Sequence, residues 1–424
     1  MKKTTLKTLQ KTASLLSVLA LAACSRYPVA TLSAPGRALP VNPSRVNSAS
    51  ARLPQTVPGQ VVVNFKTRPS ATLIQQFSQA HGLRLLKSSP MGDMLFQQTT
   101  QVATAQVMGR LKQDPYISYA GPNPIYRHNF TVNDPRSAEQ KGLGIIGMGK
   151  AWDISLGDPR VVIAVIDSGA DLDHPDLKPN LVQGYNVISQ GATPPQDDNG
   201  HGTHASGIAA AAADNREGVA GTCPRCKLMP VKALDAEGAG NAFDVAIGIV
   251  WAVDHGAQVI NMSLGGPQSD PTLERAVRYA FSRNVPVIVA AGNETTSELR
   301  YPAAIAGVIS VGAVDNNRQL ASFSNFGSWV TLVAPGVQIL STMPTKSVFM
   351  TENEGYNTRY DFMDGTSMAA PIVAGLVGLM RSRHPNLTPA QIKSRLEGTT
   401  IDLGTPGFDT NFGHGMINAP RALL

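Results

Sequence analysis

Apolar runs that alternate with helical patterns dominate the sequence from about residue 133 to the C-terminus. The runs that are mostly apolar cover residues 161–166, 258–262, 285–290 and 308–312. Stretches with apolar residues at helical spacing cover residues 205–213, 243–255 and 271–283. Strands that are apolar on both sides are typical of a parallel sheet with both faces covered. The pattern therefore predicts a doubly wound α/β domain, in which helices flank a mostly parallel sheet.

A second, shorter pattern lies between residues 59 and 128. Its order is strand, helix, strand, strand, helix, strand, at residues 60–65, 70–81, 82–86, 94–96, 104–112 and 116–120. This order predicts a small α+β domain with the split βαβ, or ferredoxin-like, arrangement. Many binding modules share that arrangement, so its role depends on the domain that follows it.

The N-terminus has the pattern of a targeting segment. Basic residues precede an apolar run at residues 15–23, which is too short to span a bilayer, so residues 1–23 are expected to be an export signal. The stretch Leu21-Ala22-Ala23-Cys24 resembles a bacterial lipobox, in which the cysteine is lipidated and anchors the protein to a membrane. An ordinary secretory signal is the alternative. Residues 24–58, rich in Pro, Ser, Ala and Arg, are expected to form a disordered linker.

Charge is divided unevenly along the chain. The formal net charge is +6, but residues 24–132 carry 11 Lys/Arg against 2 Asp/Glu, and residues 133–424 carry 21 against 28. A basic protein can indicate nucleic-acid binding. Here the larger domain is acidic and has no basic stripe, so a nucleic-acid partner is not expected. The opposite charges favour association between two parts of one chain instead.

Polar residues flanked by glycine gather near the ends of the predicted strands and helices. They lie at residues 167–169, 199–204 and 291–293. The carboxyl ends of parallel strands meet at one edge of a sheet, so Asp167, a histidine and Asn293 are expected to lie close together. Each alone has a structural alternative as a turn or helix-start residue. Together with Ser367 they predict a site for nucleophilic catalysis.

Ser367 opens an apolar helix near the C-terminus. Residues 365–371 read Gly-Thr-Ser-Met-Ala-Ala-Pro, and apolar residues continue to Leu379. Small neighbours let a substrate approach the hydroxyl closely, and a helix N-terminus favours negative charge beside it. Pro371 is expected in the first helical turn, where its missing N–H is tolerated.

These motifs resemble those of the subtilisin family of serine endopeptidases, the thermitase branch in particular. They lie at residues 165–169, 201–207, 290–293 and 365–371, in the chain order Asp, His, Ser that is known from subtilisin itself. The resemblance implies a subtilisin-like peptidase domain over residues 129–424. It also implies that residues 59–128 are an inhibitor-like propeptide, released by cleavage between residues 126 and 132.

The resemblance implies a role for each residue of the site. Ser367 attacks the scissile carbonyl, and Asp167 orients the histidine and stabilises its charged form. His204 is expected to be the general base, because the motif is taken to place the catalytic histidine last. His201, three residues earlier, is the competitor. Asn293 is expected to form the oxyanion hole together with the backbone N–H of Ser367.

Two backbone segments are expected, from the resemblance, to hold the substrate. One is formed by Ser263, Leu264, Gly265 and Gly266, and the opposite rim by Gly238 and Gly240. Pairing an extended peptide between two such edges gives breadth with modest side-chain selectivity. Glu294 lies where the family has a residue at the mouth of the P1 pocket. Its carboxylate would favour Lys or Arg at P1, with an ordinary surface glutamate as the alternative.

The resemblance also implies a structural calcium site. Asp134 and Asp176 match ligand positions, and Asn215 would add an amide oxygen, which suits a hard cation. Ordinary surface acids are the alternative. A second calcium site in residues 190–196 is not expected, because this segment lacks the acids that thermitase carries there.

Cys223 and Cys226 are the two cysteines that follow Cys24. One such pair is too small for a tetrahedral zinc site without partners. In a cytosolic protein the spacing would indicate a redox motif, but the export signal favours a structural disulfide.

The sequence thus predicts an exported serine endopeptidase that acts on extended or unfolded proteins with broad specificity. It is expected to be made as a self-processing zymogen, to work as a monomer, and to stay outside the cell or in the cell envelope. One alternative is an inactive fold that serves as a binding module, and another is a dedicated processing enzyme. The complete set of Asp167, His204, Asn293 and Ser367 argues against the inactive fold.

Overall fold

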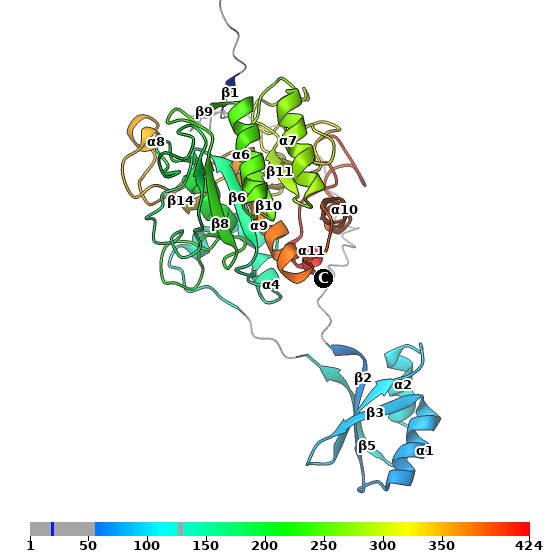
Figure 1. Cartoon of the computed structure of the whole chain (residues 1–424). Helices are drawn as coiled ribbons and strands as arrows, with labels where there is room; N and C mark the ends of the chain where they lie inside the picture. Colours follow the sequence, from blue (N-terminus) through cyan, green and yellow to red (C-terminus); the bar gives the residue numbers. More distant parts are fainter. Residues whose placement is uncertain (1–17, 21–55, 126–129) are drawn as a thin grey trace, which may run out of the picture. The chain divides into compact units, whose positions relative to one another are not determined.

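The computed structural model describes residues 18–20, 56–125 and 130–424, which fall into two compact units (Figure 1). The small unit lies within Leu32–His128, and the large unit includes Asn129–Leu424. Cys24, most of the predicted signal and linker, and residues 126–129 of the predicted cleavage region lie outside the described residues. Among the described residues, no helix has both the length and the apolar composition needed to cross a membrane.

The small unit has the predicted ferredoxin-like arrangement. Its elements are β2 (Thr56–Phe65), α1 (Ala71–His81), β3 (Leu83–Ser88), β4 (Asp93–Gln98), α2 (Thr104–Leu111) and β5 (Ile117–Pro124). The sheet order is β3-β4-β2-β5, with every pair antiparallel. Phe77 of α1 packs against Phe65 and Phe96 of the sheet. Because β2 begins at Thr56, the folded unit starts inside the stretch predicted as linker.

A seven-stranded sheet forms the centre of the large unit. Its order is β13-β12-β11-β10-β6-β8-β7, and all of its pairs are parallel. The strands are β6 (Val162–Asp167), β7 (Tyr185–Asn186), β8 (Lys227–Lys232), β10 (Val259–Met262), β11 (Val287–Ala290), β12 (Ile309–Val314) and β13 (Leu332–Pro335). This confirms the predicted doubly wound α/β fold.

Helices cover both faces of this sheet because successive side chains of each buried strand point to opposite sides. Ile163 and Val165 belong to the core that also contains residues of α5 (His201–Ala210) and α9 (Thr366–Arg383). Ala164 and Ile166 belong to the core under α6 (Ala242–Asp254) and α7 (Pro271–Ser282), the green pair in Figure 1. The almost uniformly apolar strands are thereby explained.

Shorter elements complete the large unit. They are η1 (Ser137–Glu139), α3 (Lys141–Ile145), α4 (Met148–Trp152), β9 (Ala239–Asn241), β14 (Ile339–Thr342), α8 (Phe349–Asn353), β15 (Tyr360–Met363), α10 (Pro389–Thr399) and α11 (Ala419–Leu423). β14 and β15 form an antiparallel pair, and β9 pairs with β1 (Val18–Ala20).

The order in which successive strands join the sheet reverses at β6. From β6 the chain adds β8 and β7 on one side, and later β10 to β13 on the other. Ligands of open α/β sheets bind outside the carboxyl ends of the strands at such a switch point. Asp167 is the last residue of β6, so the fold places it where a site is expected.

Candidate active site

Asp167 is bonded to His201. The imidazole Nδ1 donates to Asp167 Oδ1 at 2.8 Å, and both side chains are almost completely buried. The backbone N–H of Ser168 donates to the same carboxylate oxygen at 2.8 Å. These bonds fix the ring of His201 and leave it the tautomer that carries its proton on Nδ1.

The assignment of His204 as the partner of Asp167 is wrong. His204 is fully buried, and its Nε2 donates to the backbone carbonyl of Asp361 at 3.1 Å. Burial lowers the pKa of His204 to about 3, so this imidazole stays neutral at physiological pH. His204 is bonded to a backbone carbonyl and not to Asp167, so it lacks the carboxylate that would stabilise a charged imidazole.

His204 was chosen because the motif was taken to place the catalytic histidine last, and the start of α5 shows why the first histidine is the one beside Asp167. The helix was predicted from residue 205, but it begins at His201, so His201 occupies the helix start and His204 lies one turn deeper. Asp197 holds the first turn of α5 in place, and this role of Asp197 was not predicted. Its buried carboxylate accepts bonds from the hydroxyls of Ser168 and Thr203 and from the backbone N–H groups of Asn199, Gly200 and Thr203. An acidic residue shortly before a helix is a capping signal that was available in the sequence.

Ser367 is held by a reciprocal pair of bonds to Ser263. Its hydroxyl donates to the carbonyl of Ser263 at 3.2 Å, and the hydroxyl of Ser263 donates to the carbonyl of Ser367 at 2.8 Å. Asn261, buried on β10, donates to the hydroxyl of Ser263 at 3.0 Å. The end of β10 is thereby tied to the first turn of α9.

Pro371 explains why the carbonyl of Ser367 needs this donor. α9 begins at Thr366, so Pro371 lies in its second turn, not in the first as predicted. A proline inside a helix lacks the N–H that would bond to the carbonyl four residues earlier, which here is that of Ser367. The hydroxyl of Ser263 replaces the missing donor.

Asn293 lies beside the same helix start. Its Oδ1 accepts bonds from the backbone N–H and the hydroxyl of Thr366, at 2.8 and 2.9 Å. Its Nδ2 is buried and has no hydrogen-bond partner among the described residues. Thr366 therefore fixes the amide so that it offers an unused donor, and this role of Thr366 was not predicted.

A small pocket, with about 280 Å³ of empty space when open solvent is included, lies beside Ser367. It is lined by Ser263, Leu264, Gly265, Ala290, Ala291, Gly292, Glu294, Arg300, Thr366 and Ser367. Of the residues predicted to bind substrate, four therefore converge on the serine. Gly266 does not, because its N–H and carbonyl are bonded to Tyr301 at 2.9 and 2.8 Å. It closes the pocket wall from behind.

Gly238 and Gly240 belong to a separate strand edge. Gly238 adopts a φ of +78° in the turn before β9, and Gly240 lies within β9. β1 pairs antiparallel with this strand, with Leu19 opposite Gly240. The edge that was predicted to take an extended peptide is therefore one along which an extended chain can pair.

The three residues predicted to bind calcium lie together. Asp134 accepts backbone N–H bonds from Asp214 and Asn215, and Asn215 Nδ2 donates to Asp176 at 2.8 Å. Both carboxylates are buried. Burial raises the pKa of Asp134 and the charge of Asp176 raises it further, whereas the backbone donors lower it. Two buried carboxylates with like charge fit a cation, although the amide of Asn215 would have to turn to present its oxygen.

No group of three or more Asp, Glu, His or Cys side chains that could hold a metal occurs among the described residues. A cation at Asp134 and Asp176 would therefore depend on amide and backbone oxygens for its remaining ligands.

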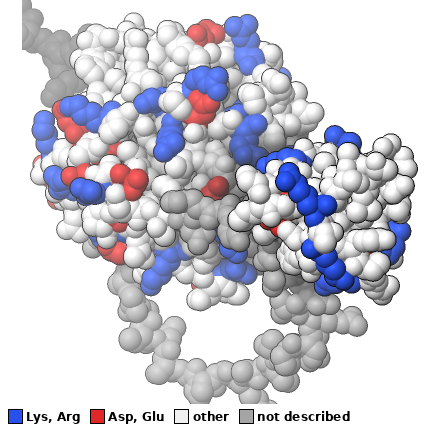
Figure 2. Space-filling model, turned by 90° about the horizontal axis from the view of Figure 1, so that it is seen from below, with Lys and Arg blue, Asp and Glu red and all other residues white. Residues whose placement is uncertain are grey.

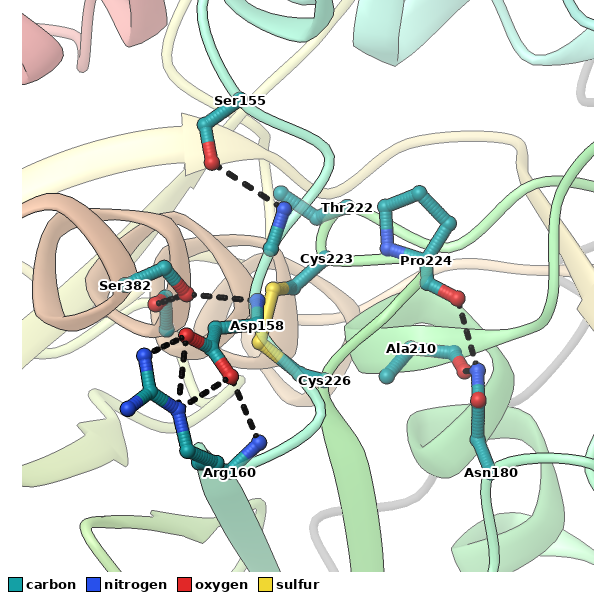
Figure 3. Close-up of a disulfide and its surroundings, with 12 residues drawn as sticks. Ser155, Asp158, Arg160, Asn180, Ala210, Thr222, Cys223, Pro224, Cys226 and Ser382 are labelled. Atoms are coloured by element: carbon teal, nitrogen blue, oxygen red, sulfur yellow. Dashed lines mark hydrogen bonds and ion pairs between the residues drawn. A yellow bond between two sulfur atoms is a disulfide. The ribbon is translucent and has the colours of Figure 1, made fainter.

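The predicted disulfide between Cys223 and Cys226 is confirmed (Figure 3). The bridge packs against Gly157 and against Gly378 of α9, where an added Cβ would lie 2.5 Å from Cys223 Sγ and 3.0 Å from Cys226 Sγ. Nearby, the backbone N–H of Asp158 donates to the hydroxyl of Ser382 at 2.9 Å. The disulfide thus lies against the helix that carries Ser367 at its other end.

Comparisons with known proteins show the family of the chain. The family model described as "Subtilase family" matches residues 158–415. A thermophilic serine proteinase of Bacillus sp. (strain AK1) is 38% identical over 368 residues, which are 87% of this chain and 88% of that protein. Thermitase of Thermoactinomyces vulgaris is 39% identical over 295 residues, which are 69% of this chain and 99% of thermitase.

Solved structures show the same likeness. A protease of Pseudoalteromonas arctica PAMC 21717 superposes with a TM-score of 0.63 at 32% identity, over 69% of this chain and 99% of that one. Fervidolysin of Fervidobacterium pennivorans, described as a keratinolytic enzyme related to subtilisin, superposes with a TM-score of 0.60 at 29% identity. The superposition covers 88% of this chain and 62% of the fervidolysin chain.

The fold and these relatives together define a serine endopeptidase. The chain belongs to the subtilase family, on its thermitase-like branch.

Proposed function

We propose that this protein is an exported serine endopeptidase of broad specificity, made as a self-processing zymogen, with Asp167, His201 and Ser367 as its catalytic residues. The observation that carries the assignment is the buried 2.8 Å bond between Asp167 and His201 at the switch point of the sheet. The family supports proteolysis itself, and the bond to Asp167 supports His201 as the histidine that serves it.

In the proposed mechanism, Asp167 holds the Nδ1–H of His201 and stabilises the imidazolium that forms. His201 Nε2 takes the proton of Ser367 as the hydroxyl attacks the scissile carbonyl, then returns it to the leaving amine. The unused Nδ2 donor of Asn293 and the backbone N–H of Ser367 stabilise the oxyanion. Water then hydrolyses the acyl-enzyme by the same proton transfers.

Substrates are proposed to bind as extended strands. The segment Ser263 to Gly265 forms one wall of the pocket beside Ser367, and β9 offers a strand edge that pairs antiparallel with β1. Main-chain pairing of this kind depends little on sequence, which supports a broad choice of extended or unfolded proteins.

The small unit is proposed to be the propeptide and intramolecular inhibitor. Among its described residues, 56–125, it carries six Lys/Arg against two Asp, and basic side chains dominate the face that Figure 2 shows. Residues 133–424 carry an excess of acidic residues, so the two units attract each other. The 368 residues matched to the strain AK1 proteinase exceed the 296 of residues 129–424, so that match extends into the N-terminal part.

Export is proposed from the basic and apolar residues of the first 23 positions, with lipidation at Cys24. Cleavage between residues 126 and 132 would release the peptidase domain from the lipid anchor. The mature enzyme would then act as a monomer outside the cell or in the cell envelope.

A structural calcium ion is proposed at Asp134, Asp176 and Asn215. When bound, it would neutralise the two buried carboxylates and hold the loop of residues 214–219 against Asp134. In the inactive Ser367→Ala protein, a chelator is expected to lower the thermal unfolding midpoint, and Asp176→Asn to remove that sensitivity. An unchanged midpoint after chelation would exclude the site.

The function is tested with wild type and Ser367→Ala, expressed in parallel with calcium present. Wild type is expected to lose its N-terminal part near residues 126–132, as seen by intact mass, and to digest unfolded casein until a serine-directed inhibitor is added. Ser367→Ala should remain full-length and inert. If both proteins stay full-length and inactive, the fold serves as a binding module instead.

A further inference from the structure

Arg300 is a charged residue in the pocket beside Ser367 that no motif predicted. Its side chain is 14% exposed, against 42% for Glu294, which lines the same pocket. The other lining residues are small, apolar or hydroxyl-bearing. The two charged residues of this lining, Arg300 and Glu294, therefore decide the charge of this space.

The backbone fixes where Arg300 stands. The next residue, Tyr301, forms an antiparallel bridge with Gly266, directly behind the wall made by Leu264 and Gly265. The guanidinium is then directed at two carboxylates, with Nε 3.5 Å from Glu294 and Nη1 3.5 Å from Glu298. These distances describe ion pairs rather than short hydrogen bonds.

Glu294 is itself held in place. Its Oε2 accepts a 2.6 Å bond from Asn325 Nδ2, and its backbone N–H donates to Asn325 Oδ1 at 3.0 Å. The carboxylate lies against Gly292, where an added Cβ would be 2.7 Å from Oε2. Glu294 is therefore fixed in the pocket wall with its charge already compensated by Arg300.

We propose that Arg300 sets the P1 selectivity of this enzyme by excluding Lys and Arg side chains from the pocket. This inference rests on the proposed function, since it names the substrate class of the same site. It reverses the preference expected from Glu294 alone. Neutral side chains of small to moderate size are the P1 residues that the pocket accepts.

The physical reason is competition for one carboxylate. A P1 lysine would bring its ammonium group beside the guanidinium of Arg300, and like charges in a partly buried pocket repel strongly. Glu294 already pairs with Arg300, so a P1 lysine would have to share that carboxylate beside a like charge, or leave Arg300 with Glu298 as its remaining partner. Leaving a charge unpaired in the complex with the wrong substrate is an established way to discriminate between substrates.

The test uses matched chromogenic peptides that differ only in having Lys, Leu or Ala at P1. The variants are Arg300→Met, which keeps bulk without charge, Glu294→Gln, and the double variant. Arg278→Ala is the matched control, because Arg278 lies on α7 and pairs with Glu274 outside the pocket. The quantity compared is the ratio of kcat/KM for Lys to that for Leu.

Arg300→Met is expected to raise this ratio at least tenfold, because it frees Glu294 for the lysine. The double variant should return it to within about threefold of wild type, and Arg278→Ala should leave it unchanged. Glu294→Gln alone should lower the ratio, which tests the same charge balance should Arg300→Met fold poorly. An unchanged ratio in Arg300→Met with the Leu peptide still cleaved, or a gain that survives in the double variant, would overturn the inference.

Failure of the proposed function looks different. If wild type cleaves none of the peptides, or if Ser367→Ala cleaves them equally well, the protease assignment falls and the selectivity inference with it. Cleavage of the Leu peptide that depends on Ser367, combined with an unchanged Lys ratio, removes only the role of Arg300.

Discussion

His201 and His204 stand three residues apart on one helix, and their surroundings give them opposite properties. Both are buried, at 1% and 0% exposure. His201 donates to the carboxylate of Asp167, whereas His204 donates to the backbone carbonyl of Asp361. A carboxylate stabilises a charged imidazolium, and a neutral carbonyl in an apolar setting does so much less. The comparison teaches that the partner of a histidine, and not its place in a motif, decides whether it can carry a proton in a reaction.

The largest effect is expected from removing His201. His201→Ala should lower kcat by about 10⁶-fold, the size found for the equivalent loss in subtilisin itself. His204→Gln, which keeps an N–H for the Asp361 carbonyl, should retain kcat within about tenfold of wild type. Steady-state kinetics on one peptide substrate check both. Equal losses of kcat in the two variants would contradict a catalytic role that belongs to His201 and not to His204.

Asn293 sharpens the comparison because it acts on the transition state without exchanging a proton. Asn293→Ala should lower kcat by about 10²–10³, again a magnitude measured on subtilisin, with KM little changed. The pH dependence of kcat/KM should stay that of wild type, since His201 is untouched. A change in KM alone would assign Asn293 to substrate binding instead.

Acid stability is expected to report the buried state of His204. The pKa of His204 is about 3 in the folded protein and near 6.5 in an unfolded chain. Below pH 6.5 the unfolded chain therefore binds a proton that the folded protein does not. The contribution is complete above pH 6.5 and falls by about 1.4 kcal/mol per pH unit as the pH drops toward 3.

Urea unfolding of Ser367→Ala between pH 7 and 4.5 measures this slope without self-digestion. Adding His204→Gln should make the free energy of unfolding less dependent on pH by about one proton. An identical pH dependence with and without His204 would contradict the buried, neutral state of this residue.

A smaller effect is expected at the carbonyl of Ser367. Ser263→Ala removes its donor and should cost about 1–3 kcal/mol of stability, the usual penalty for a buried polar group left unpaired. Pro371→Ala supplies a backbone N–H to the same carbonyl, so it should be less destabilising, or even stabilising, when combined with Ser263→Ala. Denaturant unfolding of the single and double variants checks the coupling, and strictly additive effects would show that the two donors are unrelated.

The sequence predicted strands and site residues best where a residue pattern has few structural alternatives. The apolar runs predicted β6, β10, β11 and β12 within a few residues, because strands buried on both sides have few alternatives. Asp167, Asn293 and Ser367 were found because glycines mark the turns around them. β7, only two residues long, and β13, which follows a serine-rich loop, lack such a signal.

The remaining features depend on a capping signal that was overlooked and on contacts between distant segments. The start of α5 is set by the carboxylate of Asp197, which overrides the weaker helix preference of glycine and threonine in residues 201–204. Arg300 reaches the pocket only because Tyr301 pairs with Gly266, far earlier in the chain. The contact that places Arg300 requires the tertiary fold, and so does the pairing of Asp167 with His201, which the order of residues in the motif did not reveal.

The most direct test of the central claim is the rate at which an organophosphorus serine reagent labels Ser367, followed by intact mass. Wild type and His204→Gln should be labelled at rates within about tenfold of each other, because His201 still activates the hydroxyl in both. His201→Ala, with an unchanged circular dichroism spectrum, should be labelled at least about 10³-fold more slowly. Rapid labelling of His201→Ala together with loss of labelling in His204→Gln would contradict the account and return the catalytic role to His204.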